Sequence, residues 1–370
     1  MRIAAARLRP YLLPLVRPWV AASATLVERR GMLVGIALGD GVTNRGNGAT
    51  NWGDCVTGWG DCAPLPSSGE SGQARAFAGL AAATGDLPGR TIDDALAGLA
   101  AIPCPEVRWA LETALLDAKA RRLGLPLFQL LGGDGDSGGG GPNAVPINGA
   151  LGILDEGCAA RAEAALARGF GVAKVKLGVF TTDVEIAGLR AVARRTGGRL
   201  RLRLDANRAW SEAEAIAVLD AVAGLPIDGM EEPLAAPTVG ALARLQDRYD
   251  FAIAVDESLP ALGADLLLRG PAVRRLVIKP ARLGGMAATL RLAARARAAG
   301  TEVVLTSVVD SAIGVTAAAH LARALPRPAV HGLGTLEWLA ADVAPPPLSA
   351  GGTLVLPQGA GLGLSPSAPA

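Results

Sequence analysis

The second half of the chain repeats one pattern of hydrophobic and polar positions: a short apolar run that carries or ends in a charged residue. Short apolar runs of this kind are typical of buried strands. The charges follow one another at intervals of about 23 to 29 residues, which is the length of a strand plus a crossover helix. The pattern therefore predicts parallel strands whose carboxyl ends gather these charges at one edge. The charged residues are Lys174, Lys176, Asp205, Glu231, Asp256 and Lys279.

From residue 144 onward, strands and helices are predicted to alternate. The predicted strands lie near 144–149, 171–177, 200–205, 227–231, 252–257, 274–279, 302–307 and 329–333. Helical spacing is clearest at 156–168, 183–195, 211–223 and 287–299. Ser211 followed by Glu214 is a capping-box signature that fixes the start of the third helix. Eight strands with intervening helices predict an α/β fold, a (β/α)8 barrel of the modified TIM type.

The first hundred residues lack this alternation and predict an α+β capping domain. Strand-like runs occur there together with a glycine-rich stretch and a helical stretch at 74–99. An amphipathic helix at 106–122 is expected to seal the start of the barrel, which we assign to 101–335. The proline-rich remainder, 336–370, is expected to pack back toward the cap.

Composition narrows the classes of function. Half of the 370 residues are hydrophobic, but no run reaches the roughly 20 apolar residues that a membrane span needs. Arginines and prolines near the amino end interrupt any signal-peptide core, so we expect a soluble cytoplasmic protein with no membrane partner. The 36 basic and 34 acidic residues form no long basic block, which argues against a nucleic-acid partner. A small-molecule substrate is expected, and a homo-oligomer is compatible with the sequence.

The cysteines and the glycine-rich stretch at 132–142 give weaker indications of a binding site. Four cysteines in a chain of this length do not predict a disulfide framework. Cys55 and Cys62 each close a Trp-Gly-Asp-Cys repeat, which suits a duplicated hairpin loop better than a zinc site, because further ligands at matching spacing are absent. The glycine-rich stretch at 132–142 predicts a linker, since no lysine-serine pair follows that would indicate a phosphate cradle.

Three acids at equivalent places in consecutive strand-helix units predict a metal site. Asp205, Glu231 and Asp256 offer oxygen ligands with no histidine or cysteine on the same strand tips, which suits Mg²⁺. The alternative is that each acid is a solvated helix cap. The shared relative position of all three favours metal binding.

Two lysines flank the three acid-bearing strands and predict acid–base chemistry. Lys176 and Lys279 should face each other across the metal, and Lys174 lies on the same face of its strand as Lys176. A nearby cation and a second ammonium both favour a neutral lysine, which is the form that acts as a base. The alternative, in which the lysines only pair with the carboxylates, predicts the same proximity. A metal between two lysines is suited to abstracting a proton next to a carboxylate through an enediolate.

Five motifs in this order resemble the enolase superfamily, in the muconate-lactonizing subgroup. They are Lys174-Val-Lys176, Leu204-Asp-Ala-Asn207, Glu231-Glu-Pro233, Asp256-Glu-Ser258 and Ile278-Lys-Pro280. Within the subgroup, the stretches 203–210, 58–66 and 145–148 most resemble the o-succinylbenzoate synthases of menaquinone biosynthesis. That resemblance implies a magnesium-dependent lyase that dehydrates 2-succinyl-6-hydroxy-2,4-cyclohexadiene-1-carboxylate.

The resemblance also implies a role for each site residue. Asp205, Glu231 and Asp256 would ligate Mg²⁺, with Mn²⁺ also compatible. Lys176 would remove the α-proton and return it to the departing hydroxyl, Lys279 would stabilise the enediolate, and Lys174 would tune Lys176. The cap would close over the site with a turn at 28–31 and a loop at 64–71. The expected substrate contacts are Arg30, Arg203, Asn207, Thr306, Ser307 and Gly332.

Other activities of the subgroup remain open at this stage. A dipeptide epimerase, an N-acylamino acid racemase or a cycloisomerase would use the same two lysines, and Asp310 is the obvious acid that could grip a substrate ammonium. The loop after Pro66 and the insertion at 40–58 depart from the synthase pattern, in the lobe expected to select the substrate. Of the two histidines, His320 is expected to be structural, whereas His331 lies near the last strand tip. A non-catalytic barrel and a metal-dependent hydrolase are the alternatives outside this chemistry.

Overall fold

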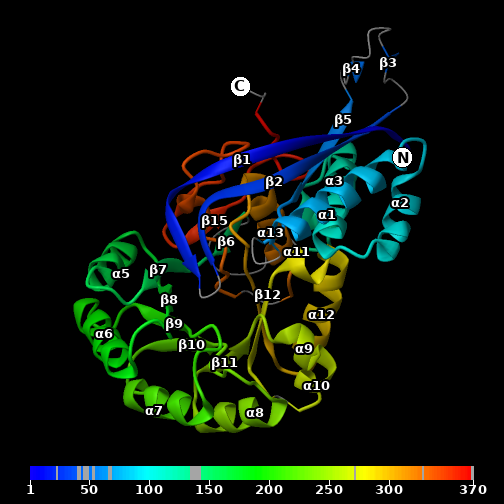
Figure 1. Ribbon diagram of the computed structural model, residues 1–370. Helices are drawn as coiled ribbons and strands as arrows, with labels where there is room; N and C mark the ends of the chain where they lie inside the picture. The colour runs from blue at the N-terminus through cyan, green and yellow to red at the C-terminus, as the bar shows by residue number, and fades with distance from the viewer. Residues whose placement is uncertain are drawn as a thin grey trace.

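The computed structural model describes residues 1–21, 24–39, 43–44, 50–51, 55–65, 69–133, 143–270, 272–326 and 329–367. Two lobes stand one above the other in Figure 1, with the amino-terminal lobe resting on the barrel. The glycine-rich stretch at 132–142, the insertion at 40–58 and the first Trp-Gly-Asp-Cys repeat fall largely or partly outside the described residues. All four cysteines are free thiols. Within the described ranges, no helix has the length and apolar character needed to cross a membrane.

The amino-terminal lobe is a three-stranded antiparallel sheet packed on helices. Its strands are ordered β1 (Ile3–Ala21), β2 (Ala24–Leu38) and β5 (Val56–Cys62), and β3 (Thr43–Asn44) pairs with β4 (Thr50–Asn51). The helices are α1 (Gly69–Gly85), α2 (Ile92–Gly98) and α3 (Pro105–Leu123). Gly58 and Gly60 let α3 approach β5 closely, because a Cβ at Gly60 would lie 1.9 Å from the Ala110 carbonyl oxygen. The predicted barrel began at 101, but α3 shares the apolar core of this lobe.

The β1–β2 hairpin is long, and its far end reaches down to the barrel (Figure 1). The turn that the resemblance implied at 28–31 is wrong, since these residues pair with β1 in the middle of β2. The missing side chain of Gly31 makes room for the Tyr11 ring, whose hydroxyl would lie 2.2 Å from a Cβ. An irregularity in the pairing between Pro14 and Trp19 accompanies the bend of the hairpin toward β7 and β8 (Figure 1).

The second lobe is the predicted barrel, with seven regular parallel strands. Their order is β7 (Gly149–Ile153), β8 (Val172–Lys176), β9 (Arg201–Asp205), β10 (Ile227–Glu231), β11 (Ala252–Val255), β12 (Arg275–Ile278) and β13 (Glu302–Leu305). The eighth position is filled by single bridges of His331 to Ile147 and of Gly332 to Thr306. The strand predicted at 144–149 is displaced, because β6 (Ala144–Pro146) pairs antiparallel with β15 (Thr353–Val355) outside the barrel.

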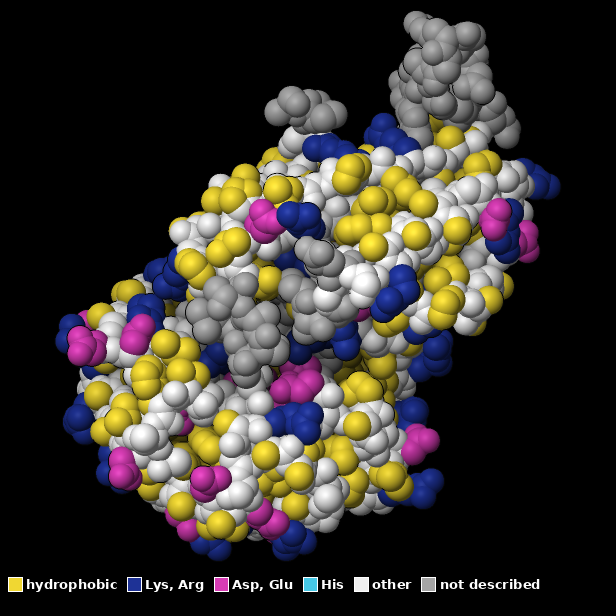
Figure 2. Space-filling view, viewed as in Figure 1, with side chains coloured by type: hydrophobic (Ala, Val, Ile, Leu, Met, Phe, Trp, Pro, Cys, Tyr) yellow, Lys and Arg dark blue, Asp and Glu magenta, His cyan; other side chains and the backbone are white. Residues whose placement is uncertain are grey.

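Helices cover the outside of the barrel. They are α5 (Cys158–Ala167), α6 (Thr182–Arg195), α7 (Glu212–Val222), α8 (Val239–Arg248), α9 (Leu259–Leu262), α10 (Ala264–Leu268), α11 (Pro280–Leu283), α12 (Met286–Ala298) and α13 (Ala312–Arg323). The predicted capping box at Ser211 is confirmed, with both reciprocal hydrogen bonds to Glu214 formed. The space-filling view shows Lys and Arg side chains interspersed with Asp and Glu over this outer face (Figure 2).

The carboxyl-terminal segment contacts both lobes. It contains η3 (Leu336–Trp338) and the β14 (Ser349–Ala350) to β15 hairpin. The Leu362 amide donates a 2.7 Å hydrogen bond to Asp117 of α3, and the Leu127 amide donates to the Gly361 carbonyl. The segment therefore helps to join the cap to the barrel.

Candidate active site

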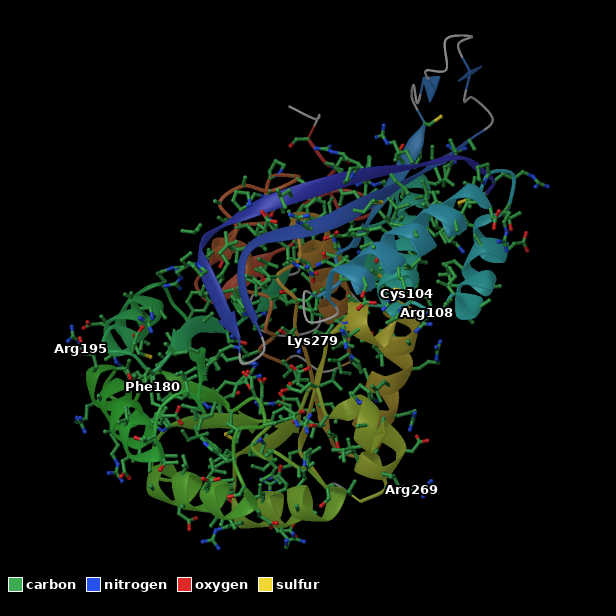
Figure 3. All side chains as sticks on the ribbon, viewed as in Figure 1. Cys104, Arg108, Phe180, Arg195, Arg269 and Lys279 are labelled. Carbon is green, nitrogen blue, oxygen red and sulfur yellow. The ribbon has the colours of Figure 1, made fainter. Side chains whose placement is uncertain are left out.

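Strand register brings the predicted lysines and acids to one end of the barrel. Lys176 pairs in register with Asp205, and Asp205 pairs with Glu231, at the carboxyl ends of β8, β9 and β10. Asp256 directly follows β11, and Lys279 directly follows β12. Figure 3 shows Lys279 near the junction of the two lobes. The repeating strand-helix unit thus gathers these side chains as predicted.

A pocket of about 410 Å³ lies between this end of the barrel and the cap. Its floor includes Lys174, Lys176, Asp205, Asp256 and Lys279. Its remaining walls come from the hairpin tip, from the residue after Pro64, from the last barrel strands and from the carboxyl-terminal segment. Among these wall residues are Arg17, Trp19, Leu65, Asn148, Val309 and Trp338.

Two of the three lysines neutralise the acids. The Lys174 ammonium lies 2.9 Å from an Asp205 oxygen and also pairs with Glu231, while Lys279 pairs with Asp256. Burial alone would lower the pKa of Lys174, but Asp205 and Glu231 outweigh it and raise that pKa above its ordinary value. Burial would raise the pKa of Asp205, and the Lys174 and Lys176 ammonium groups reverse this and lower it.

Lys176 has a different environment. Its ammonium donates a 3.2 Å hydrogen bond to Asn207 Oδ1 and forms no ion pair with any acid in the described part of the chain. Burial lowers its pKa, Asp205 opposes that shift, and the positive charges of Lys174 and Lys279 add to it. The Lys176 nitrogen also lies 5.7 Å from the centre of the Trp19 ring, which comes from the cap hairpin. Of the three lysines, Lys176 is the one whose surroundings favour the neutral, basic form.

The three acids have the donor chemistry for Mg²⁺, but they do not converge on one point. Among the described residues, no group of three histidine, cysteine, aspartate or glutamate side chains is placed to hold a metal ion. Instead, Lys174 stands between two of the acids and neutralises them. The three carboxylates carry one more negative charge than the two lysines paired with them, Lys174 and Lys279, and hard oxygen donors of this kind suit Mg²⁺.

Glu232 is a site residue that the sequence reasoning missed. It is buried and has a positive φ of 45°, and its carboxylate accepts hydrogen bonds from the amides of Asp256 and Ser258, at 2.6 and 2.9 Å. Asn207 and Arg208, on the neighbouring tip, also have positive φ. Left-handed backbone at non-glycine residues is costly and clusters at functional sites. The sequence signal was the second acid of Glu-Glu-Pro, which fixes the loop that carries Asp256.

Four of the six predicted substrate contacts lie at the pocket, and two do not. Those that line it are Asn207, Thr306, Ser307 and Gly332. Arg203 points into the barrel one layer below Asp205, where it is buried and bonded to Asp228 and Asn148. The Arg30 side chain points away from the lobe interior and pairs with Glu28 at the surface. Both predictions are corrected: Arg203 lies on the same face as Asp205 but too deep in the barrel to reach the pocket, and Arg30 lies on the opposite face of β2 from the buried Arg29.

Three aromatic and basic residues at the pocket also escaped the sequence reasoning. The Arg17 guanidinium lies 4.2 Å from the centre of the Trp338 ring, and Trp19 meets the same ring edge-on at 4.6 Å. Arg17 has no acidic partner within the described residues. Arg17 was considered only among the residues that interrupt a signal-peptide core, and the place of Arg17 and Trp19 at the pocket follows from the hairpin bend.

Three other residues considered for function, His320, His331 and Asp310, do not line the pocket. His320 is buried in α13, and its Nδ1 accepts a hydrogen bond from the Phe128 amide, as expected of a structural histidine. His331 is buried, and its Nδ1 accepts from the Leu305 amide; burial lowers its pKa to about 3. Asp310 is buried at the interface between the lobes, and its carboxylate accepts from the Val308 amide.

The chain matches two family descriptions that together cover most of its length. Residues 157–370 match the family described as "Enolase C-terminal domain-like". Residues 5–132 match the amino-terminal domain of mandelate racemase and muconate lactonizing enzyme.

Individual proteins are also similar to this chain in sequence and in structure. The chain is 34% identical over 216 residues to the L-Ala-D/L-Glu epimerase of Bacillus subtilis, a match that covers 58% of this chain and 57% of the relative. It is 34% identical over 220 residues to a chloromuconate cycloisomerase of Pseudomonas putida, with 59% and 58% covered. A dipeptide epimerase from Methylococcus capsulatus, solved with Mg and the dipeptide L-Arg-D-Lys, superimposes with a TM-score of 0.83 and 29% identity over 98% of this chain and 99% of that one. The sequence matches thus span less than two thirds of each curated relative. On the fold, the site geometry and these matches, the chain belongs to the enolase superfamily.

Proposed function

We propose that this protein is a magnesium-dependent epimerase or racemase that acts on the carbon next to the carboxylate of an N-acylated amino acid. The observation that carries the proposal is the unequal pair of lysines at one pocket. Lys176 has no acidic partner in the described residues and a lowered pKa, whereas Lys279 forms an ion pair with Asp256. One lysine is thus prepared to accept a proton and the other to donate one.

The reaction follows from these two states. Lys176 removes the α-proton from one face of the substrate, and the electron pair moves into the carboxylate to give an enediolate. Lys279 then donates a proton to the opposite face, which inverts the carbon. Starting from the other enantiomer, the two lysines exchange roles. Positioning the two lysines beside the α-carbon before the reaction lowers the activation free energy of both proton transfers.

Asp205, Glu231 and Asp256 would hold the Mg²⁺ ion. When bound, the ion supplies positive charge that stabilises the developing enediolate. Lys174 offsets part of the negative charge of Asp205 and Glu231. The comparison with a magnesium-containing dipeptide epimerase supports this choice of metal.

The charges at the pocket favour a substrate without a free ammonium group. Away from the floor, the acid at the pocket wall is Asp155, and it is paired at 2.8 Å with Arg161. Arg17, in contrast, offers a cation with no acidic partner in the described chain. Asp310, which could have gripped an ammonium, lies outside the wall. An acylated amino group, or a distal carboxylate, fits this surface better than a positive charge.

A second candidate is the dehydration carried out by the o-succinylbenzoate synthases. Its support is the likeness of 203–210, 58–66 and 145–148 to that family, and it needs the same enediolate. The relatives reported above are epimerases and a cycloisomerase, so the first candidate has the broader support.

The two candidates separate in one assay. Purified protein with Mg²⁺ is incubated in ²H₂O with a panel of dipeptides and N-acylamino acids, and loss of the α-proton signal is followed by NMR together with optical rotation. A parallel sample receives 2-succinyl-6-hydroxy-2,4-cyclohexadiene-1-carboxylate. Exchange with inversion supports the epimerase, and dehydration without exchange in the panel supports the synthase. A Lys176→Ala control should lose at least about a hundredfold in rate for the enantiomer whose proton Lys176 removes.

A further inference from the structure

A fully buried arginine joins two walls of the pocket across the lobe interface. Arg29, on β2 of the cap, is 0% exposed. Its guanidinium donates to the Val309 carbonyl at 3.2 Å, to the Pro64 carbonyl at 2.6 Å and to the Ala63 carbonyl. All three acceptors are backbone atoms of loops. A buried guanidinium with its donors used in this way fixes the relative positions of those loops.

Residues next to the acceptors in both loops line the pocket. Leu65, which follows Pro64, lines it from the cap, and Val308 and Val309 line it from the barrel. Val309 has a positive φ of 61°, a conformation that β-branched residues rarely adopt. Such a conformation persists where surrounding contacts hold it, and the Arg29 bond to the Val309 carbonyl is one of those contacts.

Asp61 ties the same two lobes a second time. Its carboxylate accepts from the Tyr11 hydroxyl at 2.8 Å within the cap. It also accepts from the amide and hydroxyl of Ser311, at 3.2 and 2.7 Å, where α13 of the barrel begins. An acid from one lobe therefore binds the start of a helix in the other, directly after the loop that lines the pocket.

Resting on the proposed function, we propose that Arg29 and Asp61 are positioning residues that hold the Val308–Val309 wall in the shape that receives the acyl part of the substrate. They touch neither the lysines nor the acids of the floor. Their effect is on how well the substrate fits, because the loop they fix lines the pocket but carries none of the lysines or acids of its floor. The cap thus contributes to binding through buried contacts as well as through its hairpin tip.

The charges around Arg29 explain why a neutral side chain would not replace it. Asp61 and Asp310 are both buried beside it. Burial raises the pKa of Asp310 to about 7, the negative charge of Asp61 adds to the rise, and Arg29 opposes it. Without the guanidinium, two buried acids would face each other uncompensated and three carbonyls would lose a donor.

The first test needs no substrate. Amide hydrogen exchange is measured in the full-length protein for Arg29→Met, Arg29→Lys and Arg30→Met, the last being the adjacent arginine that the structure places at the surface. Arg29→Met should speed exchange at the amides of Val308 and Ser311 at least about tenfold while β9 stays protected, and Arg30→Met should change nothing. Unchanged exchange at Val308 and Ser311 in a folded Arg29→Met protein would overturn the proposal, even if no substrate is found.

The second test uses the α-proton exchange assay. Arg29→Met should raise KM about tenfold or more while kcat changes less than about threefold, and Arg29→Lys should recover part of the loss. Ser311→Ala, which removes one bond to Asp61 and leaves the fold intact, should raise KM about two- to fivefold and carries the test if Arg29→Met does not fold. An equal fall of kcat in all variants, with faster exchange through both lobes, would mean a purely structural role and contradict the proposal.

Discussion

The floor of the pocket carries its reactive side chains on regularly spaced strand ends, whereas the walls above it come from a bent hairpin, two loops and an irregular carboxyl-terminal turn. Floor residues such as Lys176 and Asp205 lie in register on neighbouring strands. Wall residues such as Arg17, Val309 and Trp338 come from segments far apart in the chain. On the proposed function, the difference separates two tasks: the floor carries the groups that break the bond, and the walls select the molecule that is held there.

Removing the metal should have the largest effect and tests the floor alone. Treatment with EDTA is expected to lower the rate of α-proton exchange at least about a hundredfold, because the charge that stabilises the enediolate is worth several kcal/mol. Mg²⁺ should restore the rate, and Mn²⁺ serves as a comparison. Full activity in protein shown by elemental analysis to be free of metal would contradict the proposal that the floor acids act by holding a metal ion.

Glu232→Gln should weaken the floor indirectly. Its carboxylate holds the amides of Asp256 and Ser258, and groups that orient metal ligands are typically worth about 10- to 100-fold in metal affinity. Titration calorimetry with Mg²⁺ measures the change. Glu163→Gln, at an exposed pair with Arg195, is the matched control. Equal Mg²⁺ affinity in both variants would show that Glu232 has no part in the metal site.

Arg17→Met tests the wall. It should raise KM about tenfold for substrates with a carboxylate at the end distant from the reacting carbon, with little change for neutral analogues, since a charge pair in a partly buried site is worth about 1 to 2 kcal/mol. Steady-state kinetics on matched acidic and neutral N-acylamino acids give the comparison. An equal rise of KM with both substrates would mean that Arg17 shapes the wall without recognising the charge of the substrate.

The smallest expected effect is on the pH profile. Lys176 acts as a base in its neutral form, so kcat/KM should rise with pH and level off above its pKa. Burial lowers that pKa, and the Lys174 charge contributes to the shift, so the plateau should begin at lower pH than for an ordinary lysine. In Lys174→Met the rise should move to higher pH by about one unit or less. A profile that does not move, or that moves to lower pH, would contradict this assignment.

Sequence reasoning recovered the floor and most of the barrel because their pattern is periodic. Equal spacing of charged strand ends is visible in the chain, and the capping box at Ser211 marks a helix start directly. The walls could not be recovered in the same way. The resemblance implied a turn at 28–31, where β2 is a regular strand and Gly31 admits the Tyr11 ring. Arg30 was chosen as a substrate contact, whereas its neighbour Arg29 is the arginine that points inward. The first barrel strand was predicted at 144–149 but lies at Gly149–Ile153, because residues 144–146 pair with β15.

The central claim is that two lysines act on opposite faces of one carbon, and paired variants test it most directly. Lys176→Ala and Lys279→Ala are each given the two enantiomers of the preferred substrate separately, in ²H₂O with Mg²⁺. Each variant should still exchange the α-proton of one enantiomer, a different one for each variant, while inversion is lost in both. Exchange of the same enantiomer by both variants, or continued inversion by either, would contradict the claim.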